Sequence, residues 1–164
     1  MKKIKVAVLG STGSVGTQAL DAVRNGDFEV VMLSAGNNAD LLAKQAAEFG
    51  PKLVTTESRE AADRLRSMLP TDIKVLSEKA AILDAVRTTE ADVIIHAVSG
   101  LAGIDYALAA ADSGKRIGMA NKEAIISLGD IINRHLAASG GTMVPVDSEH
   151  SAVFQCLHEE KAPV

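Results

Sequence analysis

Two carboxylates, a hydroxyl and an imidazole stand at consecutive positions late in the sequence. They belong to the stretch PVDSEHSAVFQ, in which Asp147, Ser148, Glu149 and His150 follow one another. If the chain is still extended there, Asp147 and Glu149 point to one side, because alternate residues of a strand share a face. Carboxylates without nearby cysteines suit Mg²⁺ or Mn²⁺ rather than zinc. The cluster therefore indicates an incomplete metal site, which a third ligand, substrate and water would have to finish.

Each chemical interpretation of these motifs has a structural alternative. Asp147 or Ser148 could cap a helix that runs through HSAVFQCL, because short polar side chains accept hydrogen bonds from the first N–H groups of a helix. In the stretch ANKEA, Lys122 could meet a phosphate or a developing oxyanion, or it could be a surface lysine at a helix start. Without further context the structural alternatives, a helix cap and a surface lysine, are favoured. These residues alone do not decide between the chemical and the structural interpretation of either motif.

A glycine-rich turn near the N-terminus is a second candidate site. The stretch GSTGSVG places Gly10, Gly13 and Gly16 between a predicted strand and a predicted helix. Glycine lets backbone N–H groups approach a pyrophosphate closely at the positive end of a helix. The GxxGxxG spacing differs from the commoner GxGxxG, and a tight structural turn is the alternative. The hydroxyl groups expected to add donors are those of Ser11, Thr12 and Ser14.

The end of the second predicted strand bears on the choice of cofactor. NAD sites usually place Asp or Glu there, about 20 residues past the glycines, to hold the ribose hydroxyls. Here the stretch is SAGNN, so no carboxylate would repel a 2′-phosphate. Gly36, Asn37 and Asn38 could donate hydrogen bonds to that phosphate, although no Arg or Lys stands among them. The sequence therefore predicts NADP over NAD.

Strand and helix patterns alternate along the chain and would position these residues. Short apolar runs predict buried strands, and apolar residues at helical spacing predict helices. Strands joined by such helices form parallel units with right-handed crossovers. We therefore predict an α/β fold: a Rossmann-like, doubly wound, mainly parallel sheet with helices on both faces. The expected strands are 4–9, 28–35, 52–56, 74–77, 92–100, 116–120 and 141–146, and the later helices are 101–114 and 122–139.

In a sheet of this kind, ligands bind beyond the carboxyl ends of the strands. Every candidate segment follows a predicted strand, so we expect these segments to meet at one edge of the sheet. They are 10–16, 35–38, 98–101, 120–123 and 147–150.

Composition restricts the remaining possibilities. Of the 164 residues 47% are hydrophobic but only 2% are aromatic, so the core must be built from Val, Ile, Leu and Ala. A net charge of -4 without a basic block argues against nucleic acid or an anionic membrane as a partner. The apolar runs are too short for a signal peptide or a membrane span, which predicts a cytoplasmic protein. The single cysteine, Cys156, excludes an internal disulfide and is expected to be a small buried hydrophobe.

Taken together, the motifs resemble those of a known enzyme family. GSTGSVG at residue 10, AGNN at 35, ANKE at 120 and PVDSEHSAVFQ at 145 resemble, in order and intervals, the N-terminal part of the 1-deoxy-D-xylulose 5-phosphate reductoisomerases. The first motif is generic, but the last, coming after ANKE, is highly specific. The resemblance implies an enzyme of non-mevalonate isoprenoid biosynthesis that rearranges this sugar phosphate and reduces the product with NADPH to 2-C-methyl-D-erythritol 4-phosphate. It also implies a divalent metal (Mg²⁺ or Mn²⁺, with Co²⁺ as a further candidate) that chelates the substrate's oxygens.

The resemblance assigns roles to individual residues. Asp147 and Glu149 match metal ligands, and Ser148 matches a substrate contact. Lys122 matches an active-site lysine, so the catalytic set becomes Lys122, Asp147 and Glu149, and the substrate-binding set Lys122, Ser148 and Glu149. Family members often carry a basic residue where Asn37 stands. The residues assigned to the cofactor site are Gly10, Ser11, Thr12, Gly13, Ser14, Val15, Gly36, Asn37, Asn38, Ala120, Asn121 and Glu123.

Family chains are more than twice as long as this sequence. The resemblance implies that their remainder supplies a further metal-ligating glutamate, phosphate-binding residues, a lid, most of a homodimer interface and a C-terminal helical domain. We expect residues 1–146 to form the NADPH-binding domain and 147–164 to begin a truncated catalytic domain, which would not turn over substrate alone. The alternatives are another NADP-dependent oxidoreductase, such as a homoserine- or semialdehyde-dehydrogenase-like enzyme, and a non-catalytic nucleotide-binding domain.

Overall fold

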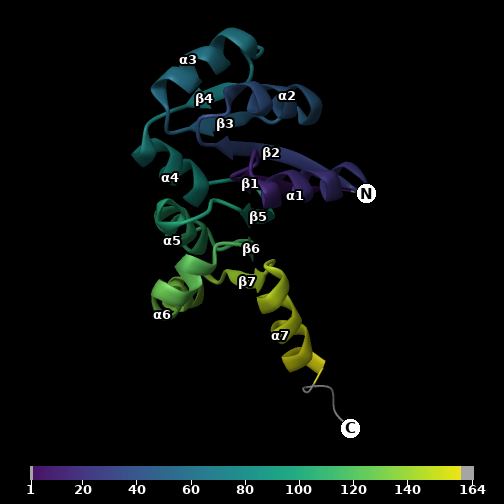
Figure 1. Cartoon of the computed structure of the whole chain (residues 1–164), viewed down its shortest axis with the longest axis vertical. Helices are drawn as coiled ribbons and strands as arrows, with labels where there is room; N and C mark the ends of the chain where they lie inside the picture. The colour runs from purple at the N-terminus through teal and green to yellow at the C-terminus, as the bar shows by residue number, and fades with distance from the viewer. Residues whose placement is uncertain (1, 160–164) are drawn as a thin grey trace.

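The chain folds around one parallel sheet whose strands alternate with helices (Figure 1). This computed structural model describes residues 2–159, with side chains described as far as residue 156. Within that range the strands pair in the order β4-β3-β2-β1-β5-β6-β7, and every pairing is parallel. The strands are β1 (Ile4–Leu9), β2 (Phe28–Ala35), β3 (Leu53–Thr56), β4 (Lys74–Leu76), β5 (Val93–His96), β6 (Arg116–Met119) and β7 (Thr142–Pro145). The helices are α1 (Ser14–Arg24), α2 (Ala39–Phe49), α3 (Arg59–Met68), α4 (Lys79–Arg87), α5 (Ile104–Asp112), α6 (Lys122–Ser139) and α7 (Ser148–Glu159).

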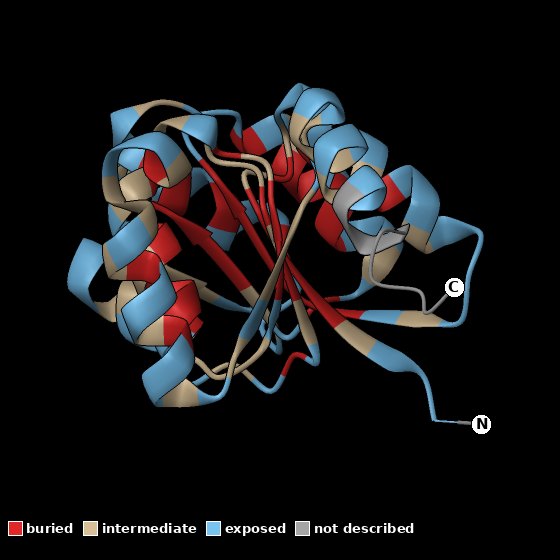
Figure 2. Ribbon diagram, turned by 90° about the horizontal axis from the view of Figure 1, so that it is seen from below, coloured by how far each residue is buried: buried red, intermediate tan, exposed pale blue. Residues whose placement is uncertain are grey.

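Helices cover both faces of the sheet, which confirms the predicted doubly wound α/β architecture (Figure 2). The central strand β1 supplies both layers, because alternate residues of a strand point to opposite faces. Val6 and Val8 join the apolar cluster under α1, α2 and α3. Ala7 and Leu9 join the cluster under α4, α5 and α6. The inner strands are therefore apolar on both sides, as parallel strands between two helical layers are.

The two apolar layers are offset along the sheet. The layer under α1 ends at Ile95 of β5, whereas the layer under α6 reaches Met143 of β7. Beyond β7 the side chain of Val146 is 43% exposed, and α7 extends away from the sheet (Figure 1). Cys156 on α7 is exposed. The expectation of a buried cysteine was therefore wrong, because α7 leaves the sheet instead of packing on it.

Some elements begin or end elsewhere than predicted. β5 ends at His96, before the predicted end at residue 100, because its partners there, Leu9 and Met119, are the last residues of the two neighbouring strands. A 3₁₀ turn, Leu101–Gly103, precedes α5 where a helix start was expected. α6 spans the predicted 122–139, but its backbone is kinked at Leu128.

The predicted division between residues 1–146 and 147–164 falls in the short connection between β7 and α7. The division itself stays a prediction, and residues 160–164 lie outside the described residues. None of the helices within the described range combines the length and apolarity that a membrane crossing requires.

Replacing Gly16 with alanine should destabilise the fold. A Cβ at Gly16 would lie 2.2 Å from the Gly10 carbonyl oxygen, so α1 would have to move away from β1. We expect Gly16→Ala to lower the free energy of unfolding by about 1–3 kcal/mol, as overpacking usually does. Urea denaturation measures the change. The control is Gly129→Ala in α6, where a Cβ would meet nothing within 4 Å and stability should stay equal or rise by up to about 1 kcal/mol. Equal stability of the two variants would contradict this account of the turn.

Candidate functional site

The glycine-rich turn after β1 is held from two sides by backbone contacts. The N–H groups of Gly10 and Ser11 both donate to the Ser34 carbonyl of β2 at 2.8 Å. A Cβ at Gly10, whose φ is +80°, would lie 2.6 Å from the Ala97 carbonyl oxygen after β5. Glycine is therefore needed for both the positive φ and the close approach. The turn lies between β1 and β5, where the strand order reverses, and sheets of this kind bind ligands at that point.

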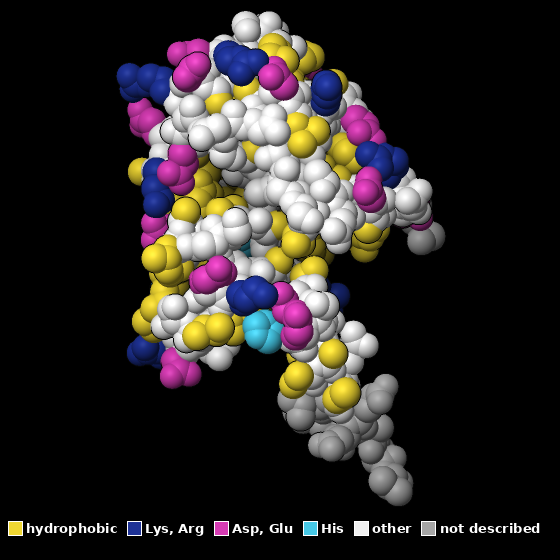
Figure 3. Space-filling model, viewed as in Figure 1, with side chains coloured by type: hydrophobic (Ala, Val, Ile, Leu, Met, Phe, Trp, Pro, Cys, Tyr) yellow, Lys and Arg dark blue, Asp and Glu magenta, His cyan; other side chains and the backbone are white. Residues whose placement is uncertain are grey.

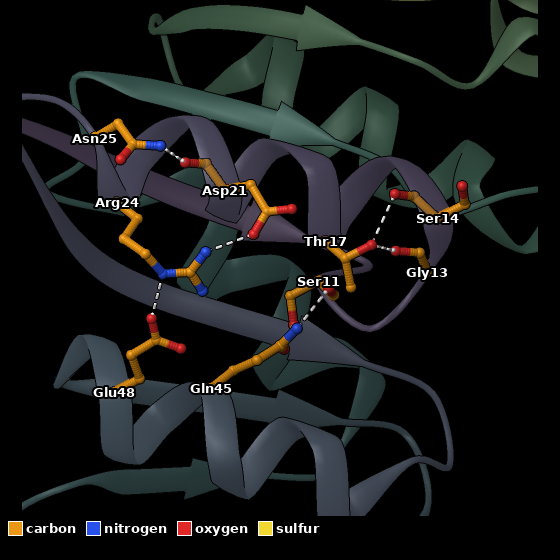
Figure 4. Close-up of polar contacts among 9 residues, drawn as sticks. All are labelled: Ser11, Gly13, Ser14, Thr17, Asp21, Arg24, Asn25, Gln45 and Glu48. Carbon is orange, nitrogen blue, oxygen red and sulfur yellow. Dashed lines mark hydrogen bonds and ion pairs between the residues drawn. The ribbon is translucent and has the colours of Figure 1, made fainter.

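The first turn of α1 presents backbone donors to solvent. Gly13 is the N-cap residue, no side chain caps the helix, and its first turn contains no acidic residue. Gly13, Ser14 and Val15 are exposed. The Thr17 hydroxyl turns back to the carbonyls of Gly13 and Ser14, at 3.0 and 2.8 Å (Figure 4). Because the first N–H groups of a helix have no partner within it, this end of α1 can bind an anionic group such as a pyrophosphate.

Ser11 does not add its hydroxyl to this open face, contrary to the prediction. Its side chain is fully buried, and its hydroxyl donates to Gln45 Oε1 at 2.8 Å (Figure 4). The Gln45 amide donates in return to the Ser11 carbonyl at 2.9 Å. This pair joins the turn to α2 and satisfies polar groups that burial would otherwise penalise. Thr12 and Ser14 remain partly or fully exposed on the open side of the turn.

The predicted nucleotide loop after β2 is exposed at Gly36, Asn37 and Asn38. Asn38 Oδ1 accepts the Leu41 N–H at 3.1 Å and so caps α2. The Gly36 carbonyl accepts the hydroxyl of Thr56 at the end of β3. These two anchors fix the loop on both sides of Asn37, which keeps an exposed side chain.

Arg64, which the sequence patterns did not single out, lies near Asn37. Both residues line a cavity of about 390 Å³, together with Ser58 and Glu60. Arg64 Nη2 lies 2.6 Å from Asp40 Oδ1, and the two side chains are 52% and 62% exposed. Exposed ion pairs of this kind contribute little to stability, so the guanidinium can turn to another anion at a small cost in free energy. α3 therefore supplies a basic group beside a loop that has none of its own.

His96, buried at the end of β5, shapes the loop that follows. Its Nε2 lies 2.8 Å from the Gly103 carbonyl oxygen, and its Nδ1 accepts the Val98 N–H at 3.3 Å. Burial lowers the pKa of His96 to about 4, because an imidazolium in an apolar environment loses its hydration. The neutral ring with its proton on Nε2 satisfies both contacts. A Cβ at Gly103 would lie 3.1 Å from this ring, so the loop fits closely around it.

Asn121, predicted to contact the cofactor, uses its side chain within the fold instead. The residue is 2% exposed. Its Nδ2 donates to the carbonyls of Val98 and Gly100, at 2.7 and 2.9 Å. Its Oδ1 accepts the Ala124 N–H at 2.6 Å and caps α6. The amide therefore joins the β5 loop to the β6 loop, and both of its donors are occupied. The predicted cofactor residues that stay partly exposed beside it are Ala120 and Glu123.

The carboxylate cluster lies at the start of a helix. α7 begins at Ser148, so Glu149 lies in its first turn and Asp147 immediately precedes it. The chain is therefore not extended here, and Asp147 and Glu149 do not share one side of a strand. The helix-capping interpretation fits instead, because Asp147 immediately precedes α7 and its carbonyl accepts the Ser151 N–H at 2.8 Å. Asp is among the residues that favour such a helix start.

The fold nevertheless brings together the side chains that the motifs single out. Lys122 Nζ at the start of α6 lies 3.2 Å from Asp147 Oδ2, and the Ser148 hydroxyl donates to Glu149 Oε2 at 2.8 Å. His150 Nδ1 lies 3.7 Å from Asp147 Oδ1. The proximity of Glu149, and then that of the Lys122 ammonium, hold the pKa of Asp147 below its usual range, while Asp147 raises the pKa of Lys122. Figure 3 shows basic, acidic and histidine side chains gathered where α7 leaves the body of the molecule.

The Asp147 and Glu149 carboxylates fit part of a divalent-metal site. Their oxygens are hard ligands of the kind that Mg²⁺ and Mn²⁺ prefer. In the described part of the chain, no group of three or more His, Cys, Asp and Glu side chains is placed to hold a metal. An ion bound here would therefore take its remaining ligands from water or from another molecule or segment.

An apolar cavity of about 640 Å³ ends at the same cluster. It runs along α1 between Val15 and Ile95 and reaches Asp147. Ile95 and Val146 meet over Gly118, where a Cβ would lie 2.9 and 3.0 Å from their side chains. The cavity thus connects the open end of α1 with the carboxylates by an apolar surface.

Acid should destabilise the fold through His96. Its pKa is about 4 in the fold, below the reference value of 6.5, so the unfolded chain binds the proton more tightly. The stabilisation is complete above pH 6.5 and falls by about 3 kcal/mol as the pH drops to about 4. Urea denaturation at intervals across this window measures it. His96→Gln should flatten the dependence, whereas His135→Gln, at a partly exposed histidine, should keep it. An unchanged slope in His96→Gln would refute this assignment.

Comparison with known proteins places these motifs in one family. The family model for 1-deoxy-D-xylulose 5-phosphate reductoisomerase matches residues 6–129. A relative of that name from Thermoanaerobacter pseudethanolicus is 42% identical over 155 residues, which are 93% of this chain and 40% of the relative. The chain thus spans about two fifths of the length of the curated relatives that it matches.

Solved structures agree with the family model. The Zymomonas mobilis reductoisomerase in complex with NADPH has a TM-score of 0.88 at 34% identity, covering 94% of this chain and 41% of that one. A DOX-P reductoisomerase in complex with NADPH, fosmidomycin and magnesium has a TM-score of 0.87 at 32% identity, covering 93% of this chain and 38% of that one. By sequence and by fold, the chain belongs to the 1-deoxy-D-xylulose 5-phosphate reductoisomerase family.

Proposed function

We propose that this chain is the N-terminal, cofactor-binding part of an NADPH- and divalent-metal-dependent reductoisomerase. The enzyme would convert 1-deoxy-D-xylulose 5-phosphate to 2-C-methyl-D-erythritol 4-phosphate in non-mevalonate isoprenoid biosynthesis. The observation that carries the proposal is the contact between Lys122 and Asp147, 3.2 Å apart. It joins the ANKE and DSEH motifs at the sheet edge that also holds the open end of α1. Membership of the family supports the reaction and the substrate.

NADPH fits the edge formed by the turn after β1 and the loop after β2. Backbone N–H groups in the first turn of α1 would hold the pyrophosphate, since no capping side chain competes for them. The 2′-phosphate would lie against Asn37, with Arg64 as its cation, because both line the same cavity. The solved relative from Zymomonas mobilis is a complex with NADPH, which supports this choice.

The residues around α7 would bind the metal and the substrate. Asp147 and Glu149 would hold Mg²⁺ or Mn²⁺, and a bound ion would supply Lewis-acid stabilisation to the substrate's oxygens. Asp147 raises the pKa of Lys122, so the lysine stays a cation that can donate a hydrogen bond to an anionic oxygen. The exposed Ser148 hydroxyl orients Glu149 and can also contact substrate. The magnesium and fosmidomycin complex of a relative supports a metal and a small anionic ligand here.

The complete activity would need more of the family polypeptide than this chain spans. The two carboxylates require further ligands, and the proposal assigns these, the phosphate-binding groups and most of a homodimer interface to the remaining part. We also propose that residues 1–146 form the NADPH-binding domain and that the catalytic domain begins at residue 147. A cytoplasmic location is part of the same proposal.

The chain should bind NADPH more tightly than NADH. The loop after β2 has no carboxylate to repel the 2′-phosphate, and Arg64 offers a charge-assisted bond, a contact that contributes roughly 1.5–3 kcal/mol. We expect a preference of about tenfold or more, measured by calorimetric titration with each cofactor in parallel. Arg64→Gln should reduce the preference, while Arg134→Gln on α6 should not. Equal affinity of the unaltered chain for both cofactors would contradict the proposal.

Metal binding by the chain alone should be weak and should depend on Asp147. With carboxylates as its protein ligands, the ion keeps most of its water. We expect calorimetry or electron paramagnetic resonance to show weak Mn²⁺ binding, which Asp147→Asn weakens about tenfold or more because one of two negative ligands is lost. Asp130→Asn, an exposed carboxylate on α6, is the control. For the same reason we expect no metal-dependent NADPH oxidation when substrate is added. Unchanged Mn²⁺ affinity in Asp147→Asn would contradict the assignment of these carboxylates as metal ligands.

A further inference from the structure

We propose that Glu57 and Tyr106 form a base-reading pair that gives the nucleotide site a preference for adenine. The inference rests on the proposed function, since it concerns the adenosine half of the same cofactor. Glu57 directly follows β3 and Tyr106 lies in α5. Neither belongs to a motif that the sequence singles out, so the pair emerges from the fold alone.

The pair lines a cavity of about 200 Å³ at the carboxyl edge of the sheet. The same cavity is lined by Gly10 of the first turn, Gly36 of the nucleotide loop and Val98 after β5. A Cβ at Gly36 would meet nothing within 4 Å, so the space beside the loop is open. A cavity of this volume between glycine backbone and apolar side chains can hold a flat ring. Because Gly10 belongs to the pyrophosphate turn, an adenosine joined to that pyrophosphate can reach this cavity.

Tyr106 fixes the direction of the Glu57 carboxylate. The tyrosine is 4% exposed, and its hydroxyl donates to Glu57 Oε1 at 2.7 Å. Burial, and then this hydrogen bond, raise the pKa of the Tyr106 hydroxyl, which therefore keeps its proton and its donor role. The nearby Lys79 ammonium pairs with Asp105 at 2.6 Å instead of with Glu57. Among the side chains that the structure describes, those of residues 2–156, no other hydrogen bond or ion pair engages this carboxylate, so its second oxygen is available to a ligand.

An oriented acceptor at the rim of an apolar cavity selects ligands that present a donor. Adenine carries an exocyclic amine, which can donate to the free oxygen of Glu57. Hypoxanthine carries an oxygen at the same position, and a carboxylate repels it. A site built to accept an N–H discriminates strongly against an analogue that lacks it, because its own polar group is left unpaired. The pair therefore favours an adenine nucleotide.

The position of Glu57 favours the base over the ribose as its ligand. In NAD sites the carboxylate that holds the ribose hydroxyls stands at the end of the second strand. Here that strand end is the SAGNN stretch, and Glu57 follows the next strand, β3. Its cavity extends toward Val98 and Ala102 of the β5 loop.

The test compares NADPH with its hypoxanthine analogue, reduced nicotinamide hypoxanthine dinucleotide phosphate, by calorimetric titration of the 164-residue chain. We expect the unaltered chain to bind NADPH at least about tenfold more tightly. Glu57→Gln should bring the ratio of the two affinities close to one, because a carboxamide can donate to the hypoxanthine oxygen. Tyr106→Phe should lower the ratio, since the acceptor is then free to turn away. Glu78→Gln, the same change of charge at an exposed residue before α4, should preserve it.

A ratio of affinities is insensitive to a general loss of stability, which acts on both ligands alike. Equal binding of both by the unaltered chain overturns the base-reading pair and leaves the cofactor proposal standing. Binding of neither overturns both proposals. If Glu57→Gln changes the ratio of the affinities for NADPH and NADH, but not the ratio of the affinities for NADPH and the analogue, Glu57 contacts the ribose and the inference is wrong.

The tyrosine itself provides an independent signal. Tyr106 is the only tyrosine and the chain has no tryptophan, so its fluorescence reports on this cavity. The adenosine half of the cofactor, added alone, should change the emission, whereas oxidised nicotinamide mononucleotide, which does not absorb where tyrosine emits, should not. Binding of the adenosine half without any change in tyrosine emission would place the base elsewhere and overturn the inference.

Discussion

The rest of the structure depends on a place where backbone segments meet without room for a side chain. A Cβ at Gly16 would lie 2.2 Å from the Gly10 carbonyl oxygen, and one at Gly10 would lie 2.6 Å from that of Ala97. These contacts hold the start of α1 against β1 and the first turn against the β5 loop. The positive end of the α1 dipole is thereby fixed at the edge where the other candidate residues gather. Packing of the sheet and presentation of the anion-binding end of α1 thus follow from the same contacts.

Buried polar side chains fix further loops along the same edge of the sheet. The Ser11–Gln45 pair joins the first turn to α2, and His96 and Asn121 fix the loops after β5 and β6. Each is satisfied within the fold, so it imposes a geometry without leaving an unpaired group in the interior. Lys122 follows Asn121 directly, so the cap that starts α6 also sets the position from which the lysine reaches the carboxylates.

Features that depend on local patterns could be predicted from the sequence. The apolar runs, the glycine turn and the motif order predicted the parallel sheet and the edge where the candidate residues lie. Contacts between distant segments could not be predicted, because Gln45, Arg64 and the Glu57–Tyr106 pair depend on how helices pack over the sheet. The start of α7 was among the alternatives that the sequence offered, but the residues around Asp147 suit both an extended segment and a helix cap, and only the end of β7 decides between them.

The apolar cavity beside α1 has a thermodynamic consequence. Covering surface lined by side chains such as Val15 and Ile95 lowers the heat capacity, because water leaves apolar groups. Binding at the open end of α1 and at the carboxylates exchanges charges and hydrogen bonds instead, with little of this signature. The apolar contribution also weakens on cooling. Warming from low temperature should therefore strengthen ligand binding in the apolar cavity beside α1 relative to ligand binding at the open end of α1. Temperature alone can thus distinguish two kinds of binding at one edge of the sheet.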